Sequence, residues 1–148
     1  MRTTVVMTRE VVVVSPSVSV AAAGQMMARL GIRHLPVVDG GRLVGVLSDR
    51  DLLRHHGAAA AQLTCGEAMT PAPLTGRPDD SVGRVAELML THKIDSVPVV
   101  DAAGRLIGLV TSSDLLALLV ERDQAQALPF DFSLRIAHSD REALVAAA

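Results

Sequence analysis

The chain has 148 residues, of which 49% are hydrophobic and 20% are charged, and its formal net charge is −2 at pH 7. This composition is typical of a globular protein rather than a disordered one, and the length is sufficient for one self-sufficient core. The charge gives no electrostatic support for a nucleic-acid partner, because nucleic-acid-binding proteins carry a basic excess.

The N-terminus has some features of a secretory signal, since Arg2 precedes several valines and Ala21-Ala22-Ala23 follows. Arg9 and Glu10 interrupt the apolar stretch, however, which a signal peptide would not tolerate. The sequence contains no run of about 18 apolar residues, so it predicts no transmembrane helix. The single cysteine, Cys65, allows no intrachain disulfide. We therefore expect a cytoplasmic protein that has no membrane partner.

The first two predicted elements are a strand and a helix. Residues 11–14 are four valines, a run too short for a helix and typical of a buried strand. Ser19 is a candidate N-cap for a helix in which apolar residues recur at helical spacing as far as Leu30. Gly31 is placed to end that helix.

A hairpin that leads into a second helix follows. Two β-rich runs flank Asp39-Gly40-Gly41, whose residues tolerate the positive φ of a tight turn. Ser48-Asp49-Arg50-Asp51 has the Ser-x-x-Asp pattern of a capping box, and this pattern predicts a helix over residues 49–56. The alanine-rich residues 57–63 predict either an extension of that helix or a loop.

The chain then repeats the same pattern. Met7-Thr8 and Met69-Thr70 open the two repeats, and Pro36 matches Pro98 at the same offset of 62 residues. The repeat predicts a weaker strand over residues 72–75, a helix capped by Ser81, a second hairpin, and a helix from Ser112 to about Arg122. One residue is inserted in the second turn.

The repeats define the predicted fold and domains. Residues 1–62 form repeat 1 and residues 63–122 form repeat 2, each with the order β-α-β-β-α. Units this small cannot each hold a stable core, so we expect them to pack together with pseudo-twofold symmetry as one α/β (α+β) module.

Residues 123–148 form a C-terminal extension. Its apolar and polar residues alternate from Leu128 to Ile136, which predicts a strand, and Ser139 to Glu142 predicts a capping box that opens a short helix. A lone strand needs partners for its backbone groups. We expect it to be exchanged with a twofold mate; pairing within its own module, an outside partner, or disorder are the alternatives.

These motifs resemble a pair of cystathionine-β-synthase (CBS) domains, also called a Bateman module. Both repeats contain Met-Thr, Pro-Val-Val-Asp, Gly-Arg-Leu-x-Gly and Ser/Thr-x-x-Asp-Leu-Leu in the same order. The resemblance implies a regulatory module that binds AMP, ADP, ATP or S-adenosylmethionine in clefts between the repeats and signals by a change of conformation or assembly. The alternatives are a ligand-free dimerisation scaffold and the regulatory subunit of a separately encoded enzyme or transporter.

The resemblance also implies which residues contact the ligand. Asp51 and Asp114 would accept hydrogen bonds from ribose hydroxyls, while Ser48 and Thr111, at helix N-termini, would offer donors to a phosphate. The alternative is that these pairs only cap helices, and the two roles are compatible.

The segments before Pro36 and Pro98 complete the predicted site. Ile32 and Ile94 would lie beside the adenine, and the cations of the first repeat would meet phosphate; a solvated Arg-His pair is the alternative. The second repeat has Asp95 and serines in the matching places, so the two clefts should not behave alike. The candidate nucleotide-binding residues are Ile32, Arg33, His34, Pro36, Ser48, Arg50, Asp51, Ile94, Ser96, Pro98, Thr111, Ser112 and Asp114.

No pattern in the sequence predicts an enzyme. The five histidines lack metal-ligand spacing, and Cys65 has no nucleophile-base pattern around it. No glycine-rich phosphate loop, nucleophile elbow or pair of catalytic carboxylates is present. We therefore expect no obligatory cofactor, with an adenine nucleotide or S-adenosylmethionine as a regulatory ligand.

A homodimer is the expected assembly. The apolar helix residues exceed what one side of a two-repeat core needs, and an exposed apolar patch is usually an interface. The alternative is that they fill the core. These residues are Met26, Met27, Leu88, Met89, Leu115, Leu116 and Leu119.

Overall fold

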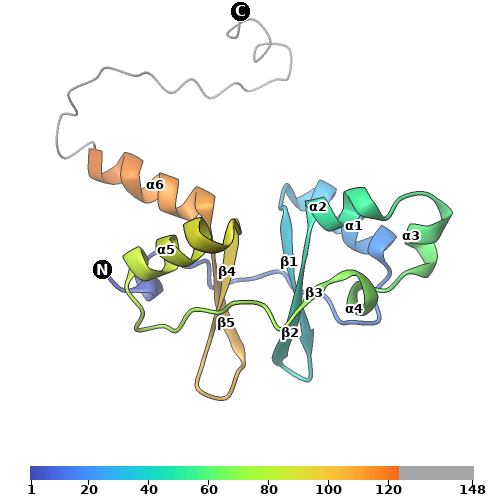
Figure 1. Cartoon of the computed structure of the whole chain (residues 1–148), viewed down its shortest axis with the longest axis horizontal. Helices are drawn as coiled ribbons and strands as arrows, with labels where there is room; N and C mark the ends of the chain where they lie inside the picture. The colour runs from blue at the N-terminus through green and yellow to red at the C-terminus, as the bar shows by residue number, and fades with distance from the viewer. Residues whose placement is uncertain (124–148) are drawn as a thin grey trace, which may run out of the picture. The chain divides into compact units, whose positions relative to one another are not determined.

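Two antiparallel hairpins form the centres of the two repeats, as predicted. In the computed structural model, which describes residues 1–123, β1 (His34–Asp39) pairs with β2 (Arg42–Ser48), and β4 (Ser96–Val100) pairs with β5 (Leu106–Thr111) (Figure 1). A register shift interrupts each hairpin at the same repeat position. The predicted strand and helix of the C-terminal extension lie outside the described residues.

The two long predicted helices are confirmed together with their caps. The Ser19 side chain accepts a hydrogen bond at the start of α1 (Val20–Leu30), and Ser81 does the same for α5 (Val82–His92). Gly31 ends α1 with a φ of 64°, in the left-handed region that favours glycine.

The capped helices after the hairpins are also present, with one difference in length. The helix α6 (Ser112–Asp123) agrees with the prediction, but α2 (Asp49–Arg54) ends two residues before the predicted end at His56. The chain leaves the helical conformation at His55, and Gly57 then has a φ of 72°. A glycine at positive φ allows the backbone to turn away there.

Short helices occupy the junctions between the repeats. The alanine-rich junction contains a separate helix, α3 (Ala58–Gln62), rather than an extension of α2. The helix α4 (Cys65–Ala68), which we had not predicted, begins with a capping box between Thr64 and Glu67. A 3₁₀ turn, η1 (Thr3–Val5), lies at the start of the first repeat, before Met7.

The strands predicted over residues 11–14 and 72–75 are wrong. Only Val14 bridges to β1, where its N–H donates to the Pro36 carbonyl and its own carbonyl accepts from Val38. Extending this parallel pairing in either direction would require an N–H from Pro36 or from Pro16, and proline has none. Proline therefore limits the pairing to one residue.

The second repeat follows the same rule. Gly76 bridges to β4 through hydrogen bonds with Pro98 and Val100, and here Pro98 and Pro78 block the extension. β-Branched composition favoured a strand in the first repeat, but the positions of the prolines determine where the ladder ends.

The opening segment of each repeat pairs with the other repeat's hairpin. Thr8 forms a bridge with Leu109 of β5, and β3 (Thr70–Pro71) pairs antiparallel with β2. Each repeat also contributes a side chain to the core of the other. Met7 packs in the core around the second hairpin, and Cys65 packs in the core around the first. The two repeats are therefore interlocked.

Side chains from the helices complete both cores. Met27 and Met89 are only 4% and 6% exposed, so these two residues of the predicted dimer patch fill the core instead.

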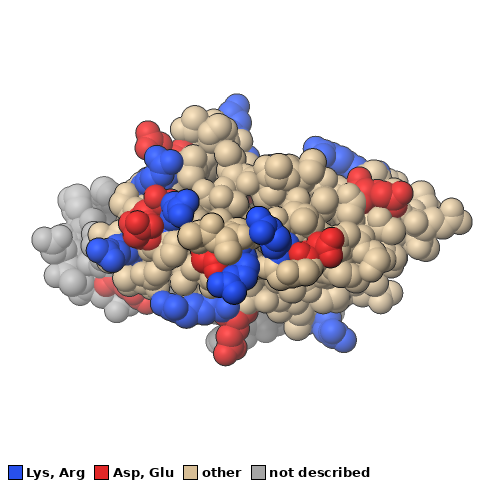
Figure 2. All heavy atoms as spheres, turned by 90° about the horizontal axis from the view of Figure 1, so that it is seen from below, with Lys and Arg blue, Asp and Glu red and all other residues tan. Residues whose placement is uncertain are grey.

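None of the helices in residues 1–123 has the length and apolar character needed to cross a bilayer. On the face seen in Figure 2, basic and acidic side chains are interspersed.

Candidate functional site

Two pockets lie between the interlocked repeats. Pocket A, of about 310 Å³, is lined by the end of β2 and the start of α2 together with Thr70 and residues 72–74 and 93–96. Pocket B, of about 280 Å³, is lined by the end of β5 and the start of α6 together with Thr8 and residues 10–12 and 31–34. Both volumes are close to the lower limit of typical small-molecule sites, about 300 Å³.

The linings of the two pockets follow the internal repeat. Thr70 of pocket A matches Thr8 of pocket B, and Asp51 matches Asp114. Each pocket thus combines the capped helix of one repeat with the loop before the first hairpin strand of the other. The pockets are two versions of one site.

Each capped helix contributes a carboxylate. In pocket A, Oδ2 of Asp51 accepts hydrogen bonds from the backbone N–H and the hydroxyl of Ser48 at 2.8 and 2.9 Å. In pocket B, Oδ2 of Asp114 accepts from the corresponding groups of Thr111 at 2.7 and 2.8 Å. Capping therefore uses only one oxygen of each carboxylate.

The second carboxylate oxygen differs between the pockets. Oδ1 of Asp51 lies 3.5 Å from a guanidinium nitrogen of Arg54. Within residues 1–123, Oδ1 of Asp114 has no side-chain hydrogen-bond donor. Both positions can accept a further hydrogen bond, because a carboxylate oxygen has two lone pairs.

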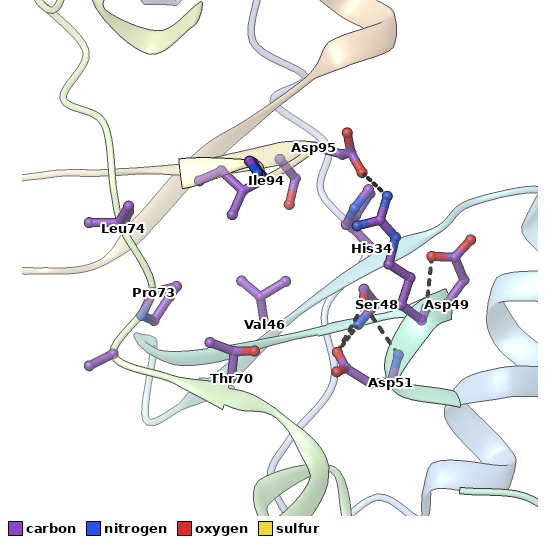
Figure 3. A pocket seen from close by; sticks show the side chains of 14 residues that line it. His34, Val46, Ser48, Asp49, Asp51, Thr70, Pro73, Leu74, Ile94 and Asp95 are labelled. Atoms are coloured by element: carbon purple, nitrogen blue, oxygen red, sulfur yellow. Dashed lines mark hydrogen bonds and ion pairs between the residues drawn. The ribbon is translucent and has the colours of Figure 1, made fainter. Parts of the chain in front are cut away.

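Pocket A is apolar at one end and polar at the other. Figure 3 shows Val46, Pro73, Leu74 and Ile94 around one end, whereas Ser48 and the acidic residues lie at the other. Such a lining suits a ligand that has a flat apolar part and a hydroxylated part.

An ion pair crosses the polar end of pocket A. A guanidinium nitrogen of Arg50, in α2, lies 3.2 Å from a carboxylate oxygen of Asp95, in the loop before β4 (Figure 3). The two side chains are 70% and 41% exposed. An exposed pair of this kind contributes about 0–1 kcal/mol to stability.

His34 lines both pockets. Burial lowers the pKa of its imidazole, while the carboxylates of Asp49 and Asp95 oppose that effect and the guanidinium groups of Arg33 and Arg50 reinforce it. The neutral imidazole can donate one hydrogen bond and accept one.

The pockets collect most of the residues predicted from the sequence. Pocket A contains His34, Ser48, Arg50, Asp51, Ile94 and Ser96. Pocket B contains Ile32, Arg33, His34, Thr111 and Asp114. Pro36, Pro98 and Ser112 line neither pocket, and both prolines are fully buried within the hairpins.

Sequence reasoning missed the residues contributed by the opening segments. Thr70, Pro73 and Leu74 line pocket A, while Thr8 and residues 10–12 line pocket B. The repeated Met-Thr pair was the available signal, but it served only to mark the start of each repeat. No group of His, Cys, Asp and Glu side chains in the described part of the chain could hold a metal ion.

The family model of the CBS domain matches residues 4–57 and 65–121. The chain belongs to the CBS-domain family. This confirms the predicted pair of CBS repeats, their mixed α/β fold and the functional class of a regulatory ligand-sensing module.

Curated relatives include one of similar size. The CBS domain-containing protein YhcV of Bacillus subtilis is 31% identical over 121 residues, which are 80% of this chain and 86% of that protein. Inosine-5'-monophosphate dehydrogenase of Korarchaeum cryptofilum is 38% identical over 107 residues, which cover 72% of this chain. The chain spans only 22% of that enzyme and 44% of protein MJ1225 of Methanocaldococcus jannaschii. Some relatives are thus enzymes, whereas residues 4–57 and 65–121 match CBS domains.

Solved structures share the fold of this CBS pair. CBSX2 in complex with AMP has a TM-score of 0.75 and 31% identity, covering 81% of this chain and 97% of that one. The CBS domain pair of protein MJ0100, in complex with 5'-methylthioadenosine and S-adenosyl-L-methionine, has a TM-score of 0.75 and 30% identity, covering 82% and 98%.

Proposed function

We propose that this CBS pair is a non-catalytic sensor that binds adenosine-containing ligands in pockets A and B. The ribose hydroxyls would donate to Asp51 in pocket A and to Asp114 in pocket B. The adenine would lie against the apolar end, beside Ile94 in pocket A and Ile32 in pocket B. The observation that carries this proposal is the repeated carboxylate, one oxygen of which the helix cap leaves available.

The shape and polarity of the pockets support an adenosine ligand. Adenine is flat and largely apolar, so Val46 and Ile94 can cover it in pocket A, and Leu109 and Ile32 can do so in pocket B. Ribose carries two adjacent hydroxyl donors, which a carboxylate accepts with charge-assisted hydrogen bonds.

The interlocked repeats support a sensing mechanism. Both pockets are lined by residues from both repeats, so a bound ligand would contact the two halves at once. Binding free energy would then favour one arrangement of the repeats over others. A regulated enzyme or transporter would detect that arrangement, and S-adenosylmethionine or an adenine nucleotide would act as a signal rather than a cofactor.

The test is calorimetric titration of the wild type with AMP, ATP and S-adenosylmethionine, repeated with Asp51→Asn and Asp114→Asn. Losing a hydrogen bond to a charged group costs about 1.5–3 kcal/mol, so each variant should weaken binding in its own pocket by about 10- to 150-fold.

The control is Glu67→Gln, which removes a capping-box carboxylate of the same geometry from α4, outside both pockets. It should leave every affinity unchanged. No binding by the wild type at millimolar ligand would contradict the proposal and favour the scaffold function.

We also propose that the module forms a homodimer through its helices. Of the candidates from the sequence, Leu116 and Leu119 are 61% and 62% exposed, whereas Met27 and Met89 are buried. Leu53 and Leu90, which were not among the candidates, are 77% and 81% exposed. An apolar surface of this kind favours an interface. Sedimentation equilibrium at micromolar concentration should give a dimer, and a monomer only would refute the proposal. The repeat boundary at residues 62/63, a cytoplasmic location and the lack of a nucleic-acid partner stay predictions.

A further inference from the structure

The two pockets carry different charged groups at matched positions. Their formal totals are equal when His34 is neutral, because pocket A has three carboxylates with Arg50 and Lys93, and pocket B has two carboxylates with Arg33. The difference between the pockets therefore lies in where these charges are placed and in which of them are already paired.

In pocket A, carboxylates already occupy the groups that would bind a phosphate at the start of α2. The backbone N–H of Arg50 donates to a carboxylate oxygen of Asp49 at 2.9 Å. The guanidinium of Arg50 is paired across the pocket with Asp95 at 3.2 Å. A phosphate here would have to displace both carboxylates and would then lie beside them. Lys93 is exposed and remains the available cation of this lining.

In pocket B, a hydroxyl and a cation occupy matched positions. Ser113 replaces Arg50 in the lining, and Ser112, which lies outside the lining, replaces Asp49. The residue directly after the capping Thr111 therefore carries no carboxylate, and no side-chain acceptor for the Ser113 amide is found among residues 1–123. Arg33 replaces Asp95, and it forms no ion pair within the described residues. Besides Asp114, the acidic residue in the lining of pocket B is the exposed Glu10.

The start of α6 is also the better anion site of the two helices. The N–H groups of Ser112 and Asp114 are bonded to the Asp95 carbonyl and the Thr111 hydroxyl, and the Ser113 amide is the donor that remains in the described part of the chain. The pocket combines this amide with a serine hydroxyl and a guanidinium, and helix N-termini attract negative charge. The helix α6 has 12 residues, whereas α2 has only 6. Arg33 can form a bidentate contact with phosphate oxygens.

We infer that the two pockets select different adenosine ligands: pocket B takes a phosphorylated adenosine, and pocket A takes an adenosyl ligand without a phosphate. The inference rests on the proposed function, since it concerns the same two pockets. Asp95 is the specificity-determining residue of pocket A, because it holds Arg50 away from a ligand phosphate and adds a negative charge at the same point.

The experiment uses AMP and adenosine as probes and separates the pockets with the ribose-site variants. In Asp114→Asn, adenosine should still bind in pocket A, while AMP affinity should fall by about tenfold or more, as expected for the loss of a hydrogen bond to a charged group. In Asp51→Asn, AMP should still bind in pocket B. Arg33→Gln should weaken AMP by a similar factor and leave adenosine unchanged.

A gain of binding tests the role of Asp95 directly. Adding Asp95→Asn to Asp114→Asn removes the carboxylate that holds Arg50, and AMP affinity for pocket A should rise by about tenfold. Adenosine affinity should not change, and melting temperatures of all variants establish that they are folded.

The outcomes distinguish the two levels of the proposal. If the wild type binds neither AMP nor adenosine, the proposed function itself is refuted. If AMP and adenosine bind pocket A with equal affinity, or if Asp95→Asn does not improve AMP binding, the adenosine sites remain but the partition between them is wrong.

Discussion

The interlocking of the repeats can be tested by a substitution at Gly108, which Met7 contacts. A methyl group placed on Gly108 would lie 2.6 Å from the Met7 sulfur, 3.0 Å from its Cγ and 3.1 Å from the Thr8 carbonyl oxygen. Real Cβ atoms essentially never lie as close as 2.6 Å to another atom, so Gly108→Ala must shift the Met7 side chain, which is packed in the second core, and must move the Thr8 carbonyl by a few tenths of an ångström. That movement would strain the Thr8–Leu109 backbone hydrogen bonds of 2.9 and 3.0 Å.

The expected loss of stability follows from two opposing effects. Overpacking a filled core costs about 1–3 kcal/mol. The smaller conformational freedom of alanine in the unfolded chain offsets about 0.4–1 kcal/mol of that cost. The middle of the two ranges leaves a net loss of about 1–2 kcal/mol. This loss should lower the melting temperature by about 3–10 °C in a unit of this size. Because Thr8 lines pocket B, AMP binding should weaken as well.

Chemical denaturation of a double-mutant cycle provides the assay. Met7→Ala alone should cost about 2–5 kcal/mol, because it leaves a cavity in the second core. In the double variant the added methyl enters the space left by Met7. The stability loss of the double variant should therefore be smaller than the sum of the two single losses by about 0.5–3 kcal/mol. Additive losses would refute the packing of Met7 against β5.

The control is Gly24→Ala in α1. There the added methyl meets the two Leu52 methyl groups at 3.5 and 3.9 Å, which are ordinary contacts, and the residue lies inside a helix. This substitution should stabilise the protein by about 0.5–1 kcal/mol. If Gly24→Ala destabilised the protein as much as Gly108→Ala, the effect of a Gly→Ala change would have a cause other than packing against Met7.

Further predictions concern pH, thiol chemistry and the C-terminal extension. Burial lowers the pKa of His34 from its value of 6.5 in the unfolded chain. As the pH falls below 6.5, the unfolded state therefore binds the proton more readily than the folded state, and the free energy of unfolding should decrease from pH 7.5 to pH 5.5. The decrease should be smaller in His34→Gln. Burial raises the pKa of the Cys65 thiol, whose residue is 0% exposed, so a thiol reagent at pH 8 should react far more slowly with the native protein than with the protein in denaturant; equal rates would contradict this packing. Deleting residues 128–148 should weaken the dimer and lower its melting temperature, since burying both phenylalanines would contribute about 3–6 kcal/mol, and no change would show that the predicted strand is not exchanged.

The sequence predicted the elements that depend on local signals. Ser19, Ser81 and Gly31 are caps whose side-chain or backbone chemistry is specified by one residue, and each is found where expected. The repeated Asp51 and Asp114 predicted both the capping boxes and the positions around which the pockets form.

The features that could not be predicted are long-range. Pairing of Thr8 with Leu109, and of β3 with β2, joins residues that are far apart in the sequence and follows no periodicity. The residues that the opening segments contribute to the pockets were missed for this reason, although they repeat at the same offset. The strand predicted over residues 11–14 is absent because of two prolines that are visible in the sequence. Their effect could not be predicted, however, because it depends on the parallel pairing with β1, which only the fold reveals.

The exchange of opening segments gives the two pockets a shared physical basis for signalling. Thr8 and Thr70 lie in the exchanged segments and also line the pockets, so a ligand in either pocket contacts the segment that locks the opposite repeat. A ligand that binds only the folded, interlocked form stabilises it by about 2.7 kcal/mol at a concentration of 100 times its Kd. This exceeds the expected loss of about 1–2 kcal/mol for Gly108→Ala. Saturating AMP should therefore restore the melting temperature of Gly108→Ala if pocket B still forms, and it should fail to do so if Thr8 has left the pocket.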